Sequence, residues 1–403
     1  MTHAHGLSID DALALIAAKI APLPAEDVDL DRALGRVLAE DVASYLDVPG
    51  FDRACMDGFA LRAADSFGAS PYEPVSLTVV GAAPAGHASP PVGPGQAVRI
   101  STGARLPVGA DAVVPVEHVE VRGGRVRLVA AVAPGKHVAR KGEDVRQGAA
   151  LLEAGRRLRP VDVGLLASVG RARVRVHRRP RVAVLTTGDE LVAPGQPLPE
   201  GRTYEANGAL LVACARAGGL DARRAGPVAD TREALGAALD ACDEDLVLST
   251  GATSAGPDDV LPELVAARGE LWFRGVDMRP GHPVAFGRVG ARVHALLPGN
   301  PVAAWVCFHA LARPALRLLE GEPRAAALAP RLRRPGRLAA KVTSTAGRTD
   351  LVRVTIDDAG AVTPLGGGAA ALLAASRAHG LLRVPRGLEG LEVGADVWVE
   401  VVE

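Results

Sequence analysis

Residues 246–259 read LVLSTGATSAGPDD, which has the pattern of a strand, a loop and the start of a helix. An apolar, β-favouring run enters a glycine-containing loop, and Pro257 then opens an expected helix with Asp258 and Asp259 in its first turn. Such a strand–loop–helix unit points backbone N–H groups and a helix N-terminus at one place, which suits an oxyanion such as phosphate. Two carboxylates beside an anion site favour a shared cation, so the motif predicts a Mg²⁺-bridged phosphate site. A glycine-rich turn without a ligand is the structural alternative.

Two further apolar segments end in polar loops. Residues 182–190 read VAVLTTGDE, and residues 293–301 read VHALLPGNP. Because ligands bind outside the carboxyl ends of the strands in an open α/β sheet, we expect these two loops and the first one to converge. Strands are expected at 181–187, 245–250 and 293–297, and helices at 206–217, 231–241, 257–268 and 301–319. The alternation predicts an α/β domain over residues 177–325, with a mostly parallel sheet and helices on both faces.

The segments on either side of this domain have the pattern of β structure. Short strands at 76–80 and 97–100, among many Val, Gly and Pro residues, predict a small β-rich domain over residues 46–139. Alternating segments at 351–356 and 396–402 predict a C-terminal β-barrel domain over residues 326–403. At the N-terminus, Ser8 followed by Asp11 predicts a helix N-cap. The predicted fold class is therefore α/β plus β, in several domains.

Composition argues against several classes of function. Lys and Arg number 46 and so do Asp and Glu, and the zero formal net charge argues against non-specific binding to nucleic acid or to a membrane surface. Aromatic residues make up 3% of the chain, too few for base-stacking platforms. The four cysteines lack CxxC spacing, so neither a zinc ribbon nor a redox pair is indicated. With no signal-peptide pattern and no uninterrupted apolar span, we expect a soluble, cytoplasmic protein with reduced thiols.

Six sequence blocks spread over nearly the whole chain resemble one enzyme family. The blocks are PGFDRACMDGFA (49–60), RISTGARLPVGADAVV (99–114), RKGEDV (140–145), LTTGDEL (185–191), MRPGHPVAFG (278–287) and LPGNPVA (297–303). In this order they resemble the molybdopterin molybdenumtransferases, bacterial enzymes similar to the E domain of gephyrin. The resemblance implies that molybdate is inserted into adenylylated molybdopterin with release of AMP, and that Mg²⁺ is the cofactor.

The resemblance also implies an architecture. Residues 1–45 and 140–176 would form an N-terminal elongated linker domain, beside the β-rich domain, the α/β molybdopterin-binding domain and the barrel. The family implies a homodimer in which the second domain of the partner subunit completes the active cleft. Contact with molybdopterin adenylyltransferase is a further expectation.

The family pattern assigns catalytic roles to residues in several blocks, which are Asp57, Thr102, Asp144, Arg274 and Arg279. Three of them have structural alternatives. Asp57 begins an Asp-Gly turn pair, Thr102 could satisfy backbone donors at a strand end, and Asp144 could be an exposed turn carboxylate. Arg274 and Arg279 bracket a short segment, and two such cations suit a dianion such as molybdate or a phosphate.

Glu190 and Asp259 are the expected Mg²⁺ ligands. Glu190 follows the 182–187 strand, where a carboxylate beside glycine is costly to bury without a cation, although with Asp189 it could instead be a helix-initiating acidic pair. Asn207 has the alternative role of a helix N-cap, and residues 298–301 that of a rigid strand-to-helix turn. The residues expected to bind the molybdopterin ligand are Thr187, Gly188, Glu190, Asn207, Gly251, Ser254, Gly256, Pro298, Gly299, Asn300, Pro301, Arg348, Arg353 and Ser376.

Four positions depart from the pattern that the family shows. Ala252 replaces a glycine that could adopt a positive φ, so the loop is expected to differ there. Arg274, Arg279 and His282 replace lysines. Arginine stays charged and binds oxyanions through a fork of donors, whereas the charge of a histidine depends on pH.

Catalysis is expected to rest on positioning and electrostatics, since the sequence shows no Ser-His-Asp or cysteine nucleophile arrangement. Two other functions remain open. One is a nucleotide hydrolase or pterin adenylyltransferase on the same α/β domain, although such proteins lack the Met-Asp-Gly and Ser-Thr-Gly-Ala blocks found here. The other is a non-catalytic scaffold, against which the acidic residues in four separate blocks argue.

Overall fold

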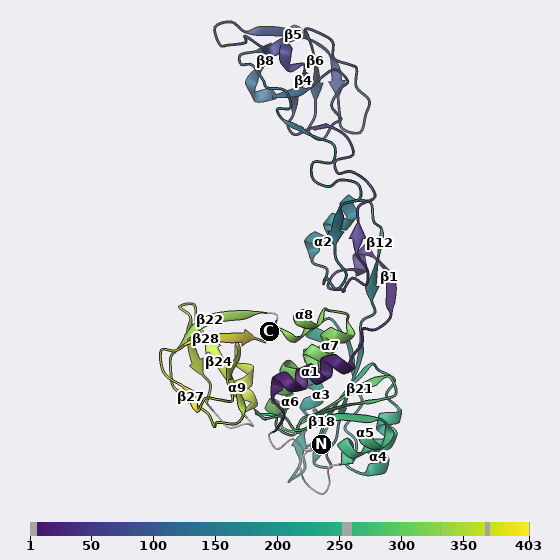
Figure 1. The fold of residues 1–403 in the computed structure, drawn as a ribbon, viewed down its shortest axis with the longest axis vertical. Coiled ribbons are helices and arrows are strands. Elements are labelled where there is room, and N and C mark those ends of the chain that lie inside the picture. The colour runs from purple at the N-terminus through teal and green to yellow at the C-terminus, as the bar shows by residue number, and fades with distance from the viewer. Residues whose placement is uncertain (1–5, 252–259, 331, 367–370, 403) are drawn as a thin grey trace.

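The computed structural model describes residues 6–251, 260–330, 332–366 and 371–402, which fold into four units (Figure 1). A β-rich unit lies at one end of an elongated molecule, and a narrow linker unit joins it to the other end. There an α/β unit and a C-terminal barrel lie side by side. The predicted multidomain fold with an α/β domain and a C-terminal barrel is confirmed.

The α/β unit is built on a 6-stranded sheet with the strand order β16-β13-β17-β21-β20-β18. Its strands are β13 (Arg181–Thr186), β16 (Asp221–Arg224), β17 (Leu246–Thr250), β18 (Glu270–Arg274), β20 (Ala285–Val289) and β21 (Arg292–Leu297). Strands β16, β13, β17 and β21 are parallel, whereas β20 is antiparallel to both of its neighbours. The carboxyl ends of β13, β17 and β21 therefore lie at one edge of the sheet.

Helices cover both faces of this sheet. They are α3 (Asn207–Ala217), α4 (Arg232–Asp240), α5 (Val260–Arg268), α6 (Pro301–Cys307) and α7 (Arg313–Leu319), and a π-helical turn joins the last two. One apolar core lies between the sheet and α4 and α5, and a larger one contains residues of α3, α6 and α7. Because both faces are covered, β17 is buried at every residue, as is typical of a central parallel strand.

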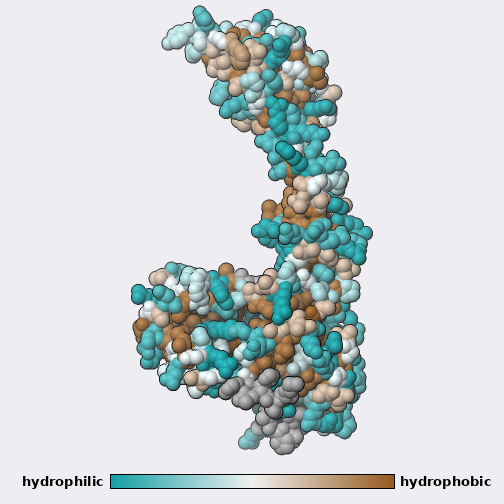
Figure 2. Space-filling model, in the orientation of Figure 1, coloured by the Kyte–Doolittle hydropathy of each residue, from teal (hydrophilic) through white to brown (hydrophobic). Residues whose placement is uncertain are grey.

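The helical stretch 301–319 has the length and hydropathy of a membrane span. Its most apolar window is 83% buried inside the protein, as expected of a core helix. Hydrophilic and hydrophobic side chains are mixed over the visible face of the four units (Figure 2).

The N-terminal helix α1 (Ile9–Lys19) packs on the α/β unit. Ser8 caps it, because its hydroxyl oxygen accepts a hydrogen bond from the Asp11 N–H at 3.1 Å, as predicted. Its buried residues, Leu13 and Ile16 among them, belong to the larger core of the α/β unit. The linker unit contains β1 (Ala25–Asp29), β2 (Val42–Ala43), β11 (Ala150–Leu152), α2 (Pro160–Ser168) and β12 (Arg173–His177).

The β-rich unit contains a second 6-stranded sheet, in the order β7-β4-β6-β5-β9-β8. Its strands are β4 (Gly58–Leu61), β5 (Val75–Ala83), β6 (Gln96–Ile100), β7 (Ala112–Pro115), β8 (Val119–Arg122) and β9 (Arg125–Leu128). The expected strands at 76–80 and 97–100 fall within β5 and β6. Below the sheet, β3 (Arg53–Ala54) pairs with β10 (Val138–Ala139).

The C-terminal barrel is closed, because its longest strand, β24 (Thr349–Ile356), pairs with β25 (Ala361–Pro364) on one side and with β26 (Gly380–Val384) on the other. Around the ring the strands are β24, β25, β22 (Arg333–Leu338), β28 (Asp396–Val401) and β26, which returns to β24. The short strand β19 (Met278–Arg279), which comes from the α/β unit, pairs in parallel with the start of β24. This pairing joins the barrel to the α/β unit.

A buried ion-pair network joins the linker unit to the α/β unit. Arg157 binds Glu320 through Nη2 at 2.6 Å and Glu322 through Nε at 2.5 Å. Its Nη1 also donates to the carbonyl oxygen of Gly35 at 2.6 Å, and Glu322 accepts a further bond from Arg317 at 2.5 Å. Burial opposes the charge of Arg157, but the two carboxylates outweigh burial and raise its pKa. We call Arg157, Arg317, Glu320 and Glu322 the Arg157 network.

Candidate functional site

The carboxyl ends of β13, β17 and β21 touch one another. The Thr187 N–H donates to the carbonyl oxygen of Thr250 at 2.9 Å. Gly251 has a φ of +94°, and a Cβ added there would lie 2.3 Å from the carbonyl oxygen of Thr187. A Cβ added at Gly299 would lie 3.6 Å from the Cα of Gly251. Glycine is therefore required at 251 for the three loops to come this close. We call this place the strand-end site.

Asn207 ties the strand-end site together from the start of α3. Its Nδ2 donates to the carbonyl oxygen of Gly299 at 2.7 Å and to Thr250 Oγ1 at 3.2 Å. Its Oδ1 is buried and has no hydrogen-bond partner in the described part of the chain. The N-cap role, which was the structural alternative for Asn207, does not hold: Ala206 occupies that position, and the side chain of Asn207 faces the neighbouring loops. A buried acceptor without a partner is costly, so a ligand donor or a water is expected there.

The loop 298–301 has the structure of a rigid strand-to-helix turn, which was the structural alternative for it. Asn300 is the N-cap of α6, because its Oδ1 accepts from the N–H groups of Val302 at 3.0 Å and Ala303 at 3.1 Å. Pro301 is the first helical residue, where a missing N–H costs nothing. Pro298 is buried and Gly299 is exposed. The capping bonds fix the loop, and they leave the backbone at Gly299 open to the strand-end site.

Carboxylates gather on one side of the strand-end site. Thr187 Oγ1 donates to Asp230 Oδ1, and the Asp230 N–H donates to Asp189 Oδ1 at 3.4 Å. The carboxylate of Glu190 lies over Gly188, where an added Cβ would be 2.7 to 2.9 Å from its atoms. Asp230 gives no signal in the sequence, because it follows β16, whose mostly polar sequence does not resemble a buried strand.

These oxygen donors are of the kind that Mg²⁺ prefers. Among the residues that the structure describes, no three acidic, His or Cys side chains lie close enough to hold a metal ion by themselves. Mg²⁺ characteristically binds through one or two carboxylates and takes its other ligands from phosphate and water, so Glu190 fits such a site. Of the other residues expected here, Ser254, Gly256 and Asp259 lie outside the described residues, as does the substituted Ala252.

Two of the expected arginines lie together where β19 meets the barrel. Arg279 on β19 donates through Nη2 to Asp350 on β24, and the two residues are paired in the parallel register. Arg348 Nε lies 3.7 Å from the other carboxylate oxygen of Asp350. Arg274 is exposed at the end of β18. His282 is also exposed, and its Nδ1 lies 2.8 Å from the carbonyl oxygen of Val276.

The remaining residues expected in the barrel contact the segment around α9 (Leu372–Ser376). Arg353 donates through Nη1 to the carbonyl oxygen of Ala371 at 3.2 Å, and burial lowers the pKa of its guanidinium. Ser376 is exposed, and its hydroxyl donates to the carbonyl oxygen of Leu373 at 2.9 Å. Both side chains therefore have local structural partners.

Asp57 and Thr102 form a separate pair in the β-rich unit, and Asp144 lies in the segment that follows this unit. Asp57 Oδ1 accepts from the Thr102 N–H at 2.6 Å and from Thr102 Oγ1 at 2.9 Å. These two bonds, the backbone bond first, lower the pKa of Asp57, which is exposed and therefore charged at neutral pH. Asp144 is exposed between β10 and β11, and its N–H donates to the carbonyl oxygen of Val48 at 3.1 Å. Within one chain this unit lies far from the strand-end site (Figure 1).

Comparison with known proteins places the chain in a family. Three family models match it in sequence: "MoeA N-terminal region (domain I and II)" over residues 7–170, "Probable molybdopterin binding domain" over 183–318 and "MoeA C-terminal region (domain IV)" over 335–402. Molybdopterin molybdenumtransferase 2 of Mycobacterium tuberculosis is 39% identical over 388 residues, which cover 93% of this chain and 94% of that protein. The chain belongs to the molybdopterin molybdenumtransferase family.

Other relatives agree with this placement. The molybdopterin molybdenumtransferase of Staphylococcus aureus is 31% identical over 408 residues, covering 98% of this chain and 96% of that protein. The crystal structure of a molybdopterin biosynthesis MoeA protein from Pyrococcus horikoshii has a TM-score of 0.83 and 30% sequence identity, and it covers 98% of this chain and 99% of that one. The resemblance on which the sequence analysis rested is therefore confirmed.

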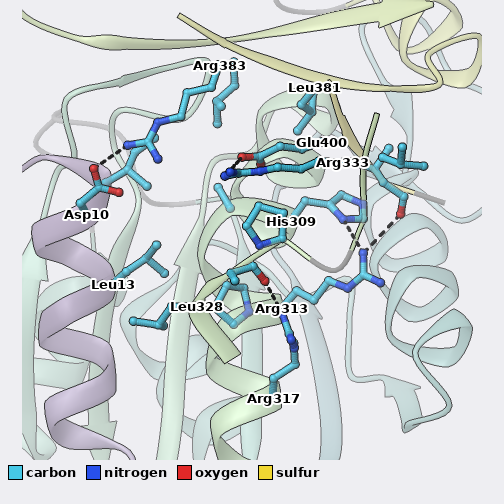
Figure 3. A pocket seen from close by; sticks show the side chains of 18 residues that line it. Asp10, Leu13, His309, Arg313, Arg317, Leu328, Arg333, Leu381, Arg383 and Glu400 are labelled. Atoms are coloured by element: carbon cyan, nitrogen blue, oxygen red, sulfur yellow. Dashed lines mark hydrogen bonds and ion pairs between the residues drawn. The ribbon is translucent and has the colours of Figure 1, made fainter. Parts of the chain in front are cut away.

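A cavity lies between α1, α7 and the barrel, and none of the site residues that the family pattern identifies lines it (Figure 3). This cavity of about 280 Å³ is lined by several arginines. Arg383 pairs with Asp10 at 2.8 Å, and Arg333 pairs with Glu400 at 3.3 Å. Burial lowers the pKa of His309, which also lines the cavity, to about 3. The arginine bonds are internal to the protein, and the first of them fastens the barrel to α1.

Proposed function

We propose that this protein inserts molybdate into adenylylated molybdopterin and releases AMP, as a Mg²⁺-dependent enzyme of molybdenum cofactor biosynthesis. The single observation that best supports this function is the strand-end site, where Thr187, Gly251 and Gly299 meet and the buried Asn207 Oδ1 lacks a hydrogen-bond partner among the described residues. Carboxyl ends of parallel strands are where α/β sheets bind nucleotides. Relatives that match more than nine tenths of this chain are named molybdopterin molybdenumtransferases.

In this proposal the loops of the α/β unit bind the nucleotide-bearing pterin. Backbone groups at Gly188, Gly251 and Gly299 approach the ligand closely because these residues lack side chains. Glu190, with Asp259, would hold Mg²⁺, which supplies positive charge at the phosphate linkage when bound. Asn207 orients the ligand through Oδ1, which has no partner within the described residues. Each group acts by position and charge, as is usual in reactions at phosphorus.

Arg279 and Arg348 would hold molybdate in this scheme, with Arg274 near the same segment. Guanidinium groups bind tetrahedral oxyanions through paired N–H donors. Arg353 and Ser376 would contact the ligand from the barrel side. Asp57 and Thr102 from the β-rich unit of a second subunit, and Asp144 from the segment that follows that unit, would act on the same ligand. The second subunit belongs to a cytoplasmic homodimer that also receives substrate from molybdopterin adenylyltransferase.

The first experiment follows AMP. Purified protein is mixed with adenylylated molybdopterin, Mg²⁺ and either molybdate or tungstate. We expect AMP release that depends on the oxyanion and on Mg²⁺, and that stops in Asp259→Ala. ATP-dependent adenylylation of molybdopterin by the protein alone would instead support an adenylyltransferase, and failure to bind any adenylylated pterin would support a scaffold.

The second experiment tests the shared site. Asp57→Ala and Glu190→Ala variants are expected to be inactive separately. If one subunit supplies Asp57 and the other Glu190, a mixture of the two variants contains heterodimers with one intact site, and activity returns to roughly a quarter of the unaltered level, as random pairing of closed two-fold dimers requires. Mixtures that stay inactive, although mass measurement shows subunit exchange, would contradict the shared site.

A further inference from the structure

The carboxylate of Asp350 lies between Arg279 and Arg348, the two arginines proposed above to hold molybdate. Asp350 is 1% exposed, and its Oδ2 accepts from Arg279 Nη2 and from Ser344 Oγ, the latter at 2.8 Å. Its Oδ1 lies 3.7 Å from Arg348 Nε, and neither of these two atoms has a hydrogen-bond partner in the described part of the chain. Asp350 is therefore a buried anion whose contacts include two partly exposed cations.

We propose that Asp350 is the positioning residue of the oxyanion site: it holds Arg279 and Arg348 close enough together for both to bind one tetrahedral dianion. The inference rests on the proposed function and deepens it, because it names the group that sets the geometry of that site. Two guanidinium groups side by side repel each other, and a carboxylate between them offsets the repulsion. The three groups together keep a single positive charge.

The two arginines retain donors for a ligand. The Arg279 side chain is 47% exposed, and Asp350 is the only partner recorded for it among the described residues. Its Nε and Nη1 donors therefore remain for an oxyanion. The Arg348 side chain is 39% exposed, and besides the contact with Asp350 its Nη2 donates to Thr345 Oγ1 at 3.4 Å. A carboxylate that fixes one edge of a guanidinium leaves the other edge in a defined direction.

The arrangement also makes the site depend on how the barrel is docked. Arg279 belongs to β19 in the α/β unit, whereas Arg348 and Asp350 belong to the barrel. The register is set by backbone pairing, in which the Thr349 N–H donates to the carbonyl oxygen of Asp277 at 2.9 Å. Breaking a buried ion pair leaves an uncompensated charge, which is strongly destabilising. Asp350 therefore couples docking of the barrel to assembly of the anion site.

The kinetic test uses Asp350→Asn, which keeps the shape and a hydrogen-bond acceptor but removes the charge. We expect the KM for molybdate to rise about tenfold or more, with kcat and the KM for adenylylated molybdopterin changed by less than about twofold. The matched control is Glu392→Gln, because Glu392 is an exposed barrel carboxylate that binds Lys341 at 2.6 Å. An unchanged KM for molybdate, or an equal change in both KM values and kcat, would overturn the proposal.

A second test needs no turnover. Molybdate alone is added to the protein, and the thermal midpoint of unfolding is measured for Arg279→Ala, Asp350→Asn and the double variant. Arg279→Ala leaves Asp350 buried without its hydrogen-bonded cation and should lower the midpoint, and Asp350→Asn in that background should restore part of it. Each variant should lose most of the upward shift that molybdate gives the unaltered protein. Additive losses of stability, or an undiminished molybdate shift, would overturn the inference. Absence of AMP release from the unaltered protein would overturn the proposed function alone.

Discussion

Arg157→Met should loosen the joint between the linker unit and the α/β unit. The change removes the guanidinium and keeps an unbranched apolar stem. Glu320 then loses both of its hydrogen bonds to Arg157, which measure 2.6 and 3.0 Å, and with them its ion-pair partner in the described structure. Glu322 keeps its bond to Arg317 at 2.5 Å. The damage is therefore concentrated on one carboxylate.

The magnitude follows from the burial of that carboxylate. Glu320 is 5% exposed, so little water can solvate the charge once Arg157 is gone. Removing one partner of a buried ion pair costs about 3–5 kcal/mol. We expect the lower end, about 3 kcal/mol, because Glu320 stands at the end of α7 and a small movement would reach solvent.

Hydrogen exchange measures this cost where it occurs. A chain of several domains does not unfold in one step, so the free energy of local opening is more informative than a single midpoint. We expect faster hydrogen exchange in residues 30–38, which include the Gly35 carbonyl that Arg157 binds, and in residues 317–323, which carry the other members of the network. Exchange in the β-rich sheet should be unchanged. Arg157→Met with Glu320→Leu should recover most of the loss, since apolar residues that replace a buried pair are often neutral.

The control is Arg159→Met. The Arg159 side chain is 62% exposed, and its partner Asp162 also binds Arg156 at 2.8 Å, so its loss should change stability little. If Arg157→Met accelerates exchange at the joint no more than Arg159→Met does, the network does not hold the two units together.

Three further predictions concern the α/β unit. Burial lowers the pKa of His294 to about 4. The contribution of the neutral, buried His294 to stability is therefore fully present above the ordinary pKa of histidine, and it falls as the pH drops toward the pKa of the folded state. From pH 7 to 5 this should cost about 2 kcal/mol, and His294→Val should remove that share of the pH dependence in thermal unfolding. Gly251→Ala should cost roughly 1–3 kcal/mol and lower AMP release, because the added Cβ meets Thr187; Gly290→Ala, with positive φ but open space, is the control and should leave AMP release unchanged. Ile16→Ala should cost about 2–5 kcal/mol in the unfolding of the α/β unit and leave hydrogen exchange in the linker unit unaltered, because Ile16 is fully buried in the α/β core.

The sequence predicted the centre of the α/β unit better than its edges. Strands β13, β17 and β21 are continuous apolar runs because helices cover both of their faces. Strand β16 is an edge strand in which only Ala222 is buried, so its sequence carries little pattern. Likewise, the packing of α1 on the α/β unit depends on contacts with α7, about three hundred residues later in the chain, and no local signal encodes them.

The candidate site was predictable where it follows strands and hidden where it depends on tertiary contact. Thr187, Gly251 and Gly299 follow apolar strands, and the structure brings them together. Asp350 gives no such signal, because a carboxylate within a barrel strand looks like a solvated face until its partners are known. The contacts of Asn207 were hidden for a related reason: an Asn at a helix start is compatible with a cap, whereas the structure pairs its side chain with the neighbouring loops.

The stiffness of the joint that the Arg157 network holds determines whether Asp57 and Thr102 can reach a strand-end site. Asp57 and Thr102 lie on the β-rich unit at the far end of the linker unit, so they reach a strand-end site only in another subunit or if the joint bends (Figure 1). If another subunit supplies them, a loosened joint places them poorly, and Arg157→Met should lower kcat although Arg157 touches no ligand. If the joint must instead bend during the reaction, the same variant should raise kcat or leave it unchanged. AMP release by Arg157→Met, compared with Arg159→Met, therefore decides between a rigid linker unit that serves a partner and a flexible one that serves its own chain.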